Sequence, residues 1–401
     1  MIGVAILGFG TVGSGVAEVL TTNADIITGN AAQEIKLKHI VDVRDFPGNP
    51  FEKLITNDFA VVESDPEVQV VVETIGGVGV ALDFTRRSLY AGKSVVTSNK
   101  ELVALHGYEL MQIAKEKGVN YLFEASVGGG IPILRPITQC LAANEINEVY
   151  GILNGTTNYI LTEMITNGLA FETALAQAQA NGFAEANPAA DIEGHDACRK
   201  ICILSALCFG KHVYPSFVNA EGITNVALDD VRYADSIGYK IKLLGRATKT
   251  ADGKIAAYVA PHLLENSNML ARVDGVMNAI MIRGNVIGDV MFYGAGAGKL
   301  PTASAVVADV IDAAKHTPAR KHVEWENGGP DNVSDAGLLE TAWYVRMDAD
   351  SEKVKKVFGE VNMIDVSGTG ELVFTTSVMS GNKIGELLKD MPARAAFRIL
   401  S

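Results

Sequence analysis

The chain begins with an apolar run that leads directly into a glycine-rich turn. Residues 2–7 are apolar, residues 8–13 spell G-F-G-T-V-G, and a second apolar stretch follows. This spacing predicts a strand, a tight turn and a helix. Gly8 permits the turn, Gly10 lets the backbone approach a pyrophosphate, and Gly13 permits close packing of helix on strand. Because a helix N-terminus attracts phosphate, the pattern favours a dinucleotide-binding domain.

Apolar runs and helical stretches alternate along the rest of the first 125 residues. Strands are predicted at 35–43, 68–73, 94–97 and 119–123, with helices such as 82–91 and 108–117 between them. This alternation predicts an α/β fold with a doubly wound parallel (Rossmann) sheet. Ligands of such sheets lie beyond the carboxyl ends of the strands. Lys100 follows the strand at 94–97, so it is a candidate for the cofactor crevice, although it could also be a solvated loop lysine.

The end of the second predicted strand carries both signals for cofactor choice. An acidic residue there, such as Asp42, would bind the ribose hydroxyls of NAD, whereas an arginine such as Arg44 would receive the 2′-phosphate of NADP. Both residues are present. The choice between NAD and NADP therefore stays open, with Arg44 favouring NADP.

A charged segment, 185–200, precedes an apolar run at 201–209 that we predict to be a buried helix. Asp196 and Lys200 are four residues apart and share one helix face, and Asp191 is a candidate helix cap. Carboxylates with one lysine suit a small zwitterionic substrate, since they would hold its ammonium while the lysine transfers a proton. The alternative is an ordinary helix ion pair, contributing about 0.2–0.5 kcal/mol, and a cap.

Length and charge narrow the class of protein. At 401 residues, two or three domains are expected. The chain has no 18-residue apolar stretch and no basic region before its first apolar run, which predicts a soluble, cytoplasmic protein without a signal peptide. A net charge of −13 argues against nucleic acid or an anionic membrane as partner.

The cysteines form no C-x-x-C pair, and we predict that they are reduced and structural: Cys140, Cys198, Cys202 and Cys208.

With these motifs in view, the chain resembles homoserine dehydrogenases over about its first 325 residues. The acidic segment 185–200 and the glycine turn belong to the resemblance. The other matching motifs are T-S-N-K-E-L from Thr97, E-A-S-V-G-G-G-I-P from Glu124, N-G-T-T-N-Y-I-L-T from Asn154 and G-A-G-A-G-K-L-P-T-A-S-A-V from Gly294.

The resemblance implies reversible, NAD(P)-dependent interconversion of L-homoserine and L-aspartate 4-semialdehyde, on the branch toward threonine and methionine. It implies that Lys200 is the proton donor or acceptor and that Lys100 contacts cofactor and substrate. It places Glu185, Asp191 and Asp196 in the substrate pocket.

The resemblance also implies cofactor contacts and a monovalent-cation site. The implied cofactor contacts are Phe9, Thr11, Val12, Arg44, Lys100 and Gly298. The cation, sodium or potassium, would be bound mainly by backbone carbonyls of Glu124, Val127, Gly129 and Ile131.

Three domains are predicted. Residues 1–132 form the dinucleotide-binding domain, completed by 302–325. Residues 133–301 form an α+β substrate and dimerisation domain, so that a homodimer or homotetramer is expected. Residues 326–401 have the order βαββαβ of a ferredoxin-like domain and resemble an ACT regulatory domain. The usual D-x-P-G-x-L turn is replaced by D-A-D-S-E-K at 348–353, so inhibition by threonine stays open and oligomerisation is an equally good role.

Two alternatives remain. Aspartate-semialdehyde dehydrogenase shares the first domain but needs a cysteine nucleophile, and no cysteine here follows a strand end in an activating context. A nucleotide-binding sensor without redox turnover would need neither Lys100 nor Lys200.

A lysine has a reference pKa of about 10.4, so a lysine base predicts faster homoserine oxidation at alkaline pH.

Overall fold

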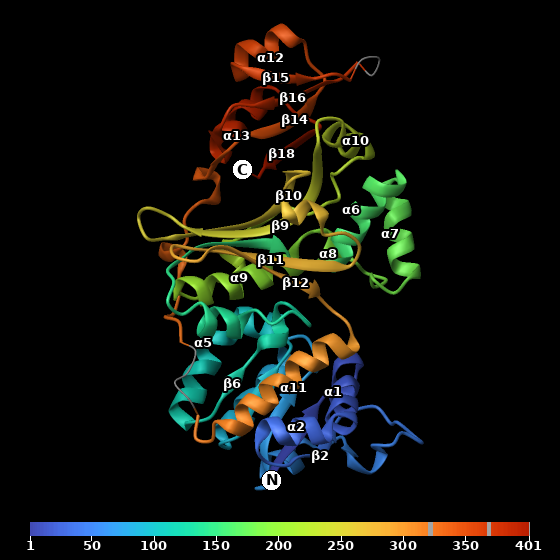
Figure 1. Ribbon diagram of the computed structural model, residues 1–401, viewed down its shortest axis with the longest axis vertical. Coiled ribbons are helices and arrows are strands. Elements are labelled where there is room, and N and C mark those ends of the chain that lie inside the picture. The colour runs from blue at the N-terminus through green and yellow to red at the C-terminus, as the bar shows by residue number, and fades with distance from the viewer. Residues whose placement is uncertain (320–323, 367–369, 401) are drawn as a thin grey trace. The chain divides into compact units, whose positions relative to one another are not determined.

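The computed structural model describes residues 1–319, 324–366 and 370–400 and contains two compact units (Figure 1). The first unit comprises 1–145, 206–215 and 294–328, and the second 146–205, 216–293 and 329–401. Residues 320–323 of the predicted return segment 302–325, with 367–369 and 401 of the C-terminal segment, lie outside the described residues. Among the described residues, no helix is both long and apolar enough to cross a bilayer.

The first unit is built on a parallel sheet of six strands in the order β3-β2-β1-β4-β5-β6. This is the strand order of a doubly wound dinucleotide-binding fold, so the predicted parallel sheet is confirmed. The strands are β1 Ile2–Leu7, β2 Ile35–Val41, β3 Ile55–Thr56, β4 Val68–Glu73, β5 Ser94–Thr97 and β6 Tyr121–Leu122. Only the two-residue β3 was not expected.

Helices pack on this sheet, and two that are distant in sequence lie side by side. Helix α11 runs next to α1 in Figure 1, so close that a Cβ at Gly15 would stand 2.8 Å from the Lys299 carbonyl oxygen. The helices are α1 Thr11–Thr22, α2 Ala24–Ala31, α3 Phe59–Ser64, α4 Gly79–Tyr90, α5 Lys100–Lys117 and α11 Lys299–Lys315, with short turns at Glu52–Leu54, Glu124–Ser126 and Pro136–Cys140.

Every residue of strand β1 is buried: β2 and β4 flank the strand, and α1 and α11 pack on the face that carries Val4 and Ile6. An apolar run without alternation is what a strand covered on both faces requires.

Helix α5 begins eight residues earlier than the predicted 108–117, so Lys100 is the first residue of a helix and not a loop residue.

The second unit contains a sheet of ten strands, ordered β12-β11-β7-β9-β10-β18-β14-β16-β15, with β8 paired to β10. The strands are β7 Ile146–Ile152, β8 Asn219–Ala220, β9 Tyr239–Lys249, β10 Ile255–Glu265, β11 Met277–Gly284, β12 Gly288–Ala295, β14 Trp343–Met347, β15 Val361–Ile364, β16 Leu372–Thr376 and β18 Ala395–Ile399; β13 Glu340–Thr341 and β17 Met379–Ser380 form a separate pair. The substrate domain and the C-terminal segment therefore share one sheet.

The helices of the second unit correct one prediction. They are α6 Gly155–Asn167, α7 Phe171–Ala180, α8 Ala189–Ile192, α9 His195–Phe209 (of which 206–209 belong to the first unit), α10 Leu228–Ser236, α12 Ser351–Phe358 and α13 Gly381–Asp390, with short turns at Pro215–Phe217, Met269–Arg272, Pro330–Asn332 and Ala336–Leu338. Asp191 lies inside α8, four residues before α9 begins at His195. The prediction that Asp191 caps the buried helix is wrong, because Gly194 (φ +84°) reverses the chain between the two helices.

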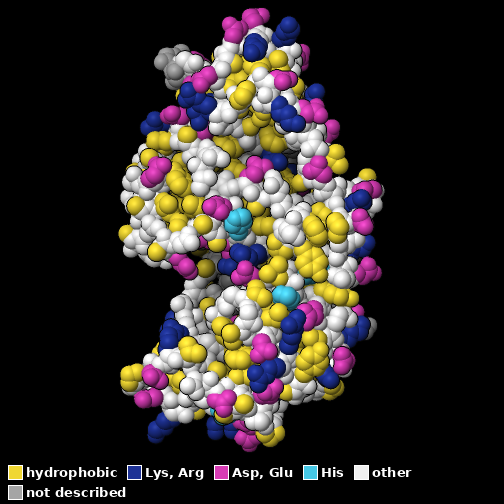
Figure 2. All heavy atoms as spheres, turned by 180° about the vertical axis from the view of Figure 1, so that it is seen from behind, with side chains coloured by type: hydrophobic (Ala, Val, Ile, Leu, Met, Phe, Trp, Pro, Cys, Tyr) yellow, Lys and Arg dark blue, Asp and Glu magenta, His cyan; other side chains and the backbone are white. Residues whose placement is uncertain are grey.

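The C-terminal segment has the predicted element order βαββαβ, with its strands in the order β18-β14-β16-β15. It joins the rest of the unit where β18 pairs in parallel with β10. Arg346 of β14 also makes a buried bidentate ion pair with Asp230 of α10, at 2.7 and 3.0 Å. On the face seen in Figure 2, acidic, basic and apolar side chains are interspersed over this segment at the top of the view.

The central strand β10 carries a fully buried histidine whose ring must be neutral. His262 Nδ1 lies 2.9 Å from the Ala260 carbonyl and Nε2 3.0 Å from the Tyr258 hydroxyl. A carbonyl only accepts, so Nδ1 carries the proton and Nε2 accepts from Tyr258. Burial lowers the pKa of His262 to about 3.

This histidine should make the second unit sensitive to acid. The unfolded chain protonates His262 below a pH of about 6.5 and the folded chain does not, so the stability is full above that pH and falls as pH decreases toward 3. We expect His262→Gln to remove about 1.4 kcal/mol per pH unit from the slope of unfolding free energy against pH between 6 and 4. Urea unfolding across that range measures it. The exposed His195→Gln is the control, and equal slopes in wild type and His262→Gln would contradict the assignment.

Candidate active site

The glycine turn of the first unit has the geometry that its spacing predicts. Gly8 has φ +90°, a conformation that favours glycine. A Cβ at Gly13 would stand 2.0 Å from the Gly8 carbonyl oxygen, whereas a Cβ at Gly10 would meet no atom within 4 Å. Gly13 is thus required for the helix to pack on the turn. The open space at Gly10, where α1 begins, fits a group bound at the helix N-terminus.

The residues around this turn are held by the end of β2. Phe9 is buried against Phe46 and Phe51, and its amide donates to Asp42 Oδ2 at 2.6 Å. Thr11 and Val12 are the first two residues of α1. Asp42 is therefore a structural acceptor for the glycine turn as well as a candidate ribose ligand.

Arg44 forms a bidentate pair with the same carboxylate. Its Nε and Nη2 each donate to Asp42, at 2.9 Å, and this guanidinium holds the pKa of Asp42 well below its usual range. The Arg44 side chain is 59% exposed. With both Asp42 oxygens engaged, the group that faces solvent at the end of β2 is a cation.

Lys100 is positioned by a buried hydrogen-bonded chain at the ends of β4 and β5. The fully buried Glu73 accepts from the Thr97 hydroxyl at 2.6 Å and from the Ile75 amide at 2.8 Å. Asn99 Oδ1 caps α5 through the Leu102 amide, and its Nδ2 donates to the Gly77 carbonyl at 2.6 Å. The first residue of α5 is thereby fixed at the edge where ligands bind this fold. Sequence reasoning did not find Glu73, because a lone carboxylate at a strand end has no distinguishing pattern.

Gly298 immediately precedes α11 and has φ +127°. The glycine-rich segment that begins at Gly294 therefore serves as a helix start. Because α11 packs on α1, Gly298 belongs to the same unit as the glycine turn. Whether it contacts the cofactor stays a prediction.

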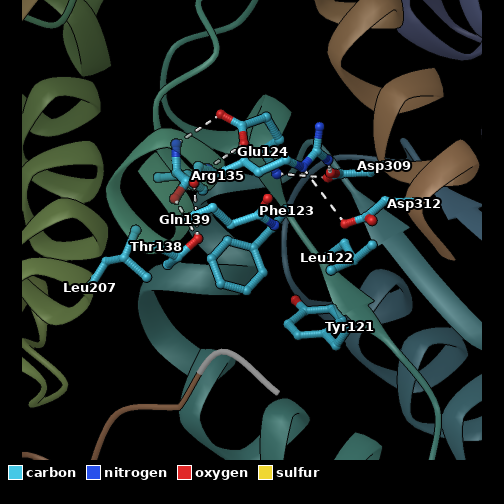
Figure 3. A pocket seen from close by; sticks show the side chains of 11 residues that line it. Tyr121, Leu122, Phe123, Glu124, Arg135, Thr138, Gln139, Leu207, Asp309 and Asp312 are labelled. Atoms are coloured by element: carbon cyan, nitrogen blue, oxygen red, sulfur yellow. Dashed lines mark hydrogen bonds and ion pairs between the residues drawn. The ribbon is translucent and has the colours of Figure 1, made fainter. Parts of the chain in front are cut away.

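The Glu124 side chain is used inside the protein. Its carboxylate accepts from the backbone amides of Ile133, Leu134 and Arg135, so it caps the following helical segment. Figure 3 shows Glu124 beside Arg135 and Asp309 at a cavity of about 50 Å³. Arg135 pairs with Asp309, and burial raises the pKa of Asp309 to about 8.

The backbone after Glu124 forms a tight loop with carbonyls available for a cation. The Gly128 carbonyl accepts from Ile131, and the Gly130 amide donates to Ala295. Among the hydrogen bonds of the described residues, none ends on the backbone oxygens of Val127, Gly129 or Ile131. Carbonyl oxygens suit hard cations, so this loop fits a cation bound through backbone atoms. In the described part of the chain, no three His, Cys, Asp or Glu side chains gather as a metal site.

The charged segment of the second unit forms a buried ion pair. Lys200 Nζ lies 2.9 Å from Asp196 Oδ2 and donates to the Leu153 carbonyl at 2.7 Å. Lys200 is 6% exposed and Asp196 3%. The pair lies on one face of α9, as the four-residue spacing predicts, and it is buried.

Asn154 connects the two aspartates. Its Nδ2 donates to Asp191 Oδ1 at 2.7 Å and to Asp196 Oδ2 at 2.9 Å, while its Oδ1 caps α6. Sequence reasoning quoted this residue in a motif but gave it no role. The N-G-T-T pattern before an apolar helix could have indicated a cap, but not the second use of the amide.

Glu185 differs from the buried Asp196 and Lys200 in its exposure to solvent. It is exposed in the connection between α7 and α8, where its backbone oxygen accepts from Gln179 at 3.1 Å. Its place in the substrate pocket stays a prediction. Cys198 and Cys202 are buried in α9, as expected for structural thiols.

Family models match both halves of this architecture. The model described as "Homoserine dehydrogenase, NAD binding domain" matches residues 8–124, and "Homoserine dehydrogenase" matches 132–311. Homoserine dehydrogenase of Neisseria gonorrhoeae is 44% identical over 317 residues, which cover 78% of this chain and 72% of that protein. The enzyme of Pseudomonas aeruginosa is 43% identical, with 86% and 81% covered.

The chain belongs to the homoserine dehydrogenase family.

Solved structures agree with this membership. Homoserine dehydrogenase from Thiobacillus denitrificans has a TM-score of 0.90 and 35% identity and covers 100% of this chain and 98% of its own. A hyperthermophilic archaeal homoserine dehydrogenase in complex with NADPH has a TM-score of 0.65 and 28% identity, with 78% and 97% covered. The predicted oxidoreductase function is confirmed, and the sensor and aspartate-semialdehyde dehydrogenase alternatives are set aside.

Two glycines of this homoserine dehydrogenase should separate folding from cofactor binding. Gly13→Ala introduces a Cβ that overlaps the Gly8 carbonyl, so we expect its thermal midpoint to fall by several degrees without any cofactor. Gly10→Ala meets no protein atom, so its midpoint should stay near that of the wild type while cofactor affinity falls. Thermal unfolding and nicotinamide fluorescence titration measure both effects. Equal loss of midpoint in the two variants would contradict this division.

Proposed function

We propose that this homoserine dehydrogenase interconverts L-homoserine and L-aspartate 4-semialdehyde, with Lys200 transferring the proton. The observation that carries the proposal is the buried Lys200 ammonium, held by Asp196 and the Leu153 carbonyl. A side chain that donates to two fixed acceptors is presented in one position, as proton transfer requires.

The geometry fits Lys200 as the acid in aldehyde reduction. Its two acceptors, a carboxylate and a carbonyl, both favour the protonated amine. In the direction of alcohol oxidation, the lysine must first be neutral to take the hydroxyl proton. Oxidation of homoserine should therefore accelerate as the pH rises, and reduction of the aldehyde should be favoured nearer neutrality.

The aspartates supply the second requirement, a place for the substrate ammonium. Asp191 and Asp196 contact one amide nitrogen and lie in the same unit as Lys200. An ammonium group bound to carboxylates would orient the substrate's hydroxyl carbon toward a hydride acceptor. We assign Glu185 to the rim of this site, since its exposed side chain is available to a ligand.

The nicotinamide cofactor supplies the hydride acceptor or donor when it is bound. Gly8, Gly10 and Gly13 form the turn that would hold its pyrophosphate, and Phe9, Thr11, Val12, Lys100 and Gly298 are the other proposed contacts. Arg44 is a half-exposed guanidinium at the position that reads the ribose, which supports a preference for NADP over NAD. Lys100 begins α5 at the same edge and is the second candidate for proton transfer.

Three further assignments concern the cation, the C-terminal segment and the assembly. The backbone oxygens of the 124–131 loop support a sodium or potassium ion. The βαββαβ order and the β18-β14-β16-β15 arrangement support an ACT-like C-terminal segment. We propose a homodimer or homotetramer in the cytoplasm, acting in threonine and methionine biosynthesis with no nucleic-acid or membrane partner.

Replacing the proposed proton carrier is the first test. We expect Lys200→Met to lower kcat for homoserine about 10²- to 10⁴-fold, the usual contribution of a general acid or base. The Kd for NADP should stay within about twofold, because the glycine turn lies in the other unit. Initial rates at pH 7–10 and fluorescence titration provide both numbers.

Lys254→Met, at an exposed lysine of the same unit, is a matched control and should retain wild-type rates. Full activity in Lys200→Met with loss in Lys100→Met would transfer the proton role to Lys100. A wild type that turns over homoserine with neither cofactor would sink the proposed reaction itself.

Cofactor choice is tested at Arg44. We expect Arg44→Ala to raise the KM for NADP about 10-fold or more while changing the KM for NAD less than about threefold, because an arginine–phosphate pair is lost only in NADP. Steady-state kinetics with each cofactor measure the ratio. Arg86→Ala, which removes another paired surface arginine of the same unit, should leave the ratio unchanged. Parallel increases for both cofactors would mean that Arg44 does not read the phosphate.

A further inference from the structure

We infer that Asn154 is a positioning residue of the homoserine site. Its amide nitrogen holds Asp191 and Asp196 at a fixed spacing and weakens the attraction of the Asp196 carboxylate for the Lys200 ammonium. The inference rests on the proposed function of that site. It concerns a residue that would act through the carboxylates and the lysine and need not touch the substrate.

The orientation of the Asn154 amide is fixed by the start of α6. Its Oδ1 accepts from the Thr157 amide at 2.9 Å and from the Thr157 hydroxyl at 3.0 Å. An asparagine amide offers two acceptor positions and two N–H groups. Because Thr157 occupies the oxygen, the NH₂ end must face the aspartates, and each of its hydrogens has one carboxylate partner. The amide cannot reverse without losing all four hydrogen bonds.

Helix α6 is itself anchored one turn further on. Asn158 Nδ2 donates to the carbonyls of Val273 and Met277, each at 3.0 Å, and its Oδ1 accepts from Lys242. Lys242 is fully buried and also donates to Val273 O at 2.6 Å and Asp274 at 3.0 Å. The first turn of α6 is therefore held by the sheet and cannot follow the aspartates if they move.

The first consequence concerns the two carboxylates. Asp191 belongs to α8 and Asp196 to α9, and the two helices are joined by only Glu193 and Gly194. Two carboxylates bound to one nitrogen lie close together and repel each other when both are ionised. The Asn154 donors offset this repulsion and fix the spacing, so that a single ammonium group can contact both.

The second consequence concerns the lysine. Asp196 Oδ2 accepts from Asn154 Nδ2 and from Lys200 Nζ, both at 2.9 Å. A carboxylate oxygen that already accepts one hydrogen bond attracts the ammonium less strongly than one with no other donor. Asn154 therefore makes the loss of the lysine proton easier, which is the step that alcohol oxidation needs.

The test uses two variants that keep the helix cap. Serine and aspartate are both good N-cap residues, so Asn154→Ser loses only the two donors, and Asn154→Asp presents an oxygen where the donors stood. Asn268→Ser is the matched control: Asn268 caps the Met269–Arg272 turn through the Leu270 amide at 2.9 Å, and within the described part of the chain its side chain forms no hydrogen bond with the aspartates. Homoserine kinetics from pH 7 to 10, NADP titration and thermal unfolding are measured on each full-length protein.

For Asn154→Ser we expect the KM for homoserine to rise about 10- to 100-fold, the effect of losing hydrogen bonds to charged groups. The midpoint of the pH profile for oxidation should move to higher pH by about half a unit or more. Asn154→Asp should lose more activity than Asn154→Ser, although the aspartate side chain has the same shape as the asparagine that it replaces. The NADP Kd should stay within about twofold, and Asn268→Ser should match the wild type in KM and pH midpoint.

Other outcomes would overturn the inference. A Ser variant with the wild-type KM and pH midpoint would show that the amide donors do not position the site. A lower thermal midpoint with no kinetic change would reduce Asn154 to a helix cap. If Asn154→Ser does not fold, an Asp variant as active as wild type would still refute the role. A wild type without homoserine turnover would count against the proposed function and not against this assignment.

Discussion

The candidate active site depends on the buried carboxylate of Asp196. One of its oxygens accepts from both Lys200 and Asn154, so the proposed proton carrier and the aspartate bridge meet at a single atom. A buried charge without partners would be strongly destabilising, and here two donors from different elements stabilise it. Because α6 supplies one donor and α9 the other, the catalytic arrangement exists only when those two helices are packed together.

Both units use an asparagine in the same way. Asn99 follows β5 and caps α5 with its oxygen, while its amide nitrogen holds the loop after β4 through the Gly77 carbonyl. Asn154 follows β7 and caps α6, while its nitrogen holds two carboxylates. A side chain with an acceptor at one end and donors at the other can start a helix and fix a functional group at once. Lys100 is thereby placed at a helix start, and the carboxylate that pairs with Lys200 is held by a capping residue.

Sequence reasoning succeeded where local spacing determines geometry. The glycine turn and the sharing of a helix face by Asp196 and Lys200 follow from residues within one element, and the structure confirms both placements. It failed for contacts that join distant elements and for two local arrangements. The Asn154 bridge spans 37 and 42 residues, and the cap assigned to Asp191 was wrong because a glycine reversal inserts a separate short helix. The pairing of Arg44 with Asp42 was missed because each residue was weighed as an independent cofactor ligand.

The C-terminal segment is part of the fold of the second unit and not an appended module. Its strand β18 pairs with β10, and the bidentate pair of Arg346 with Asp230 is buried, with the Tyr344 hydroxyl also donating to Asp230 at 3.0 Å. Separating the segment would remove the Arg346 and Tyr344 partners of Asp230 and would expose one edge of β10. Through Asp230 the segment is joined to α10, which packs on α6, the helix that Asn154 caps.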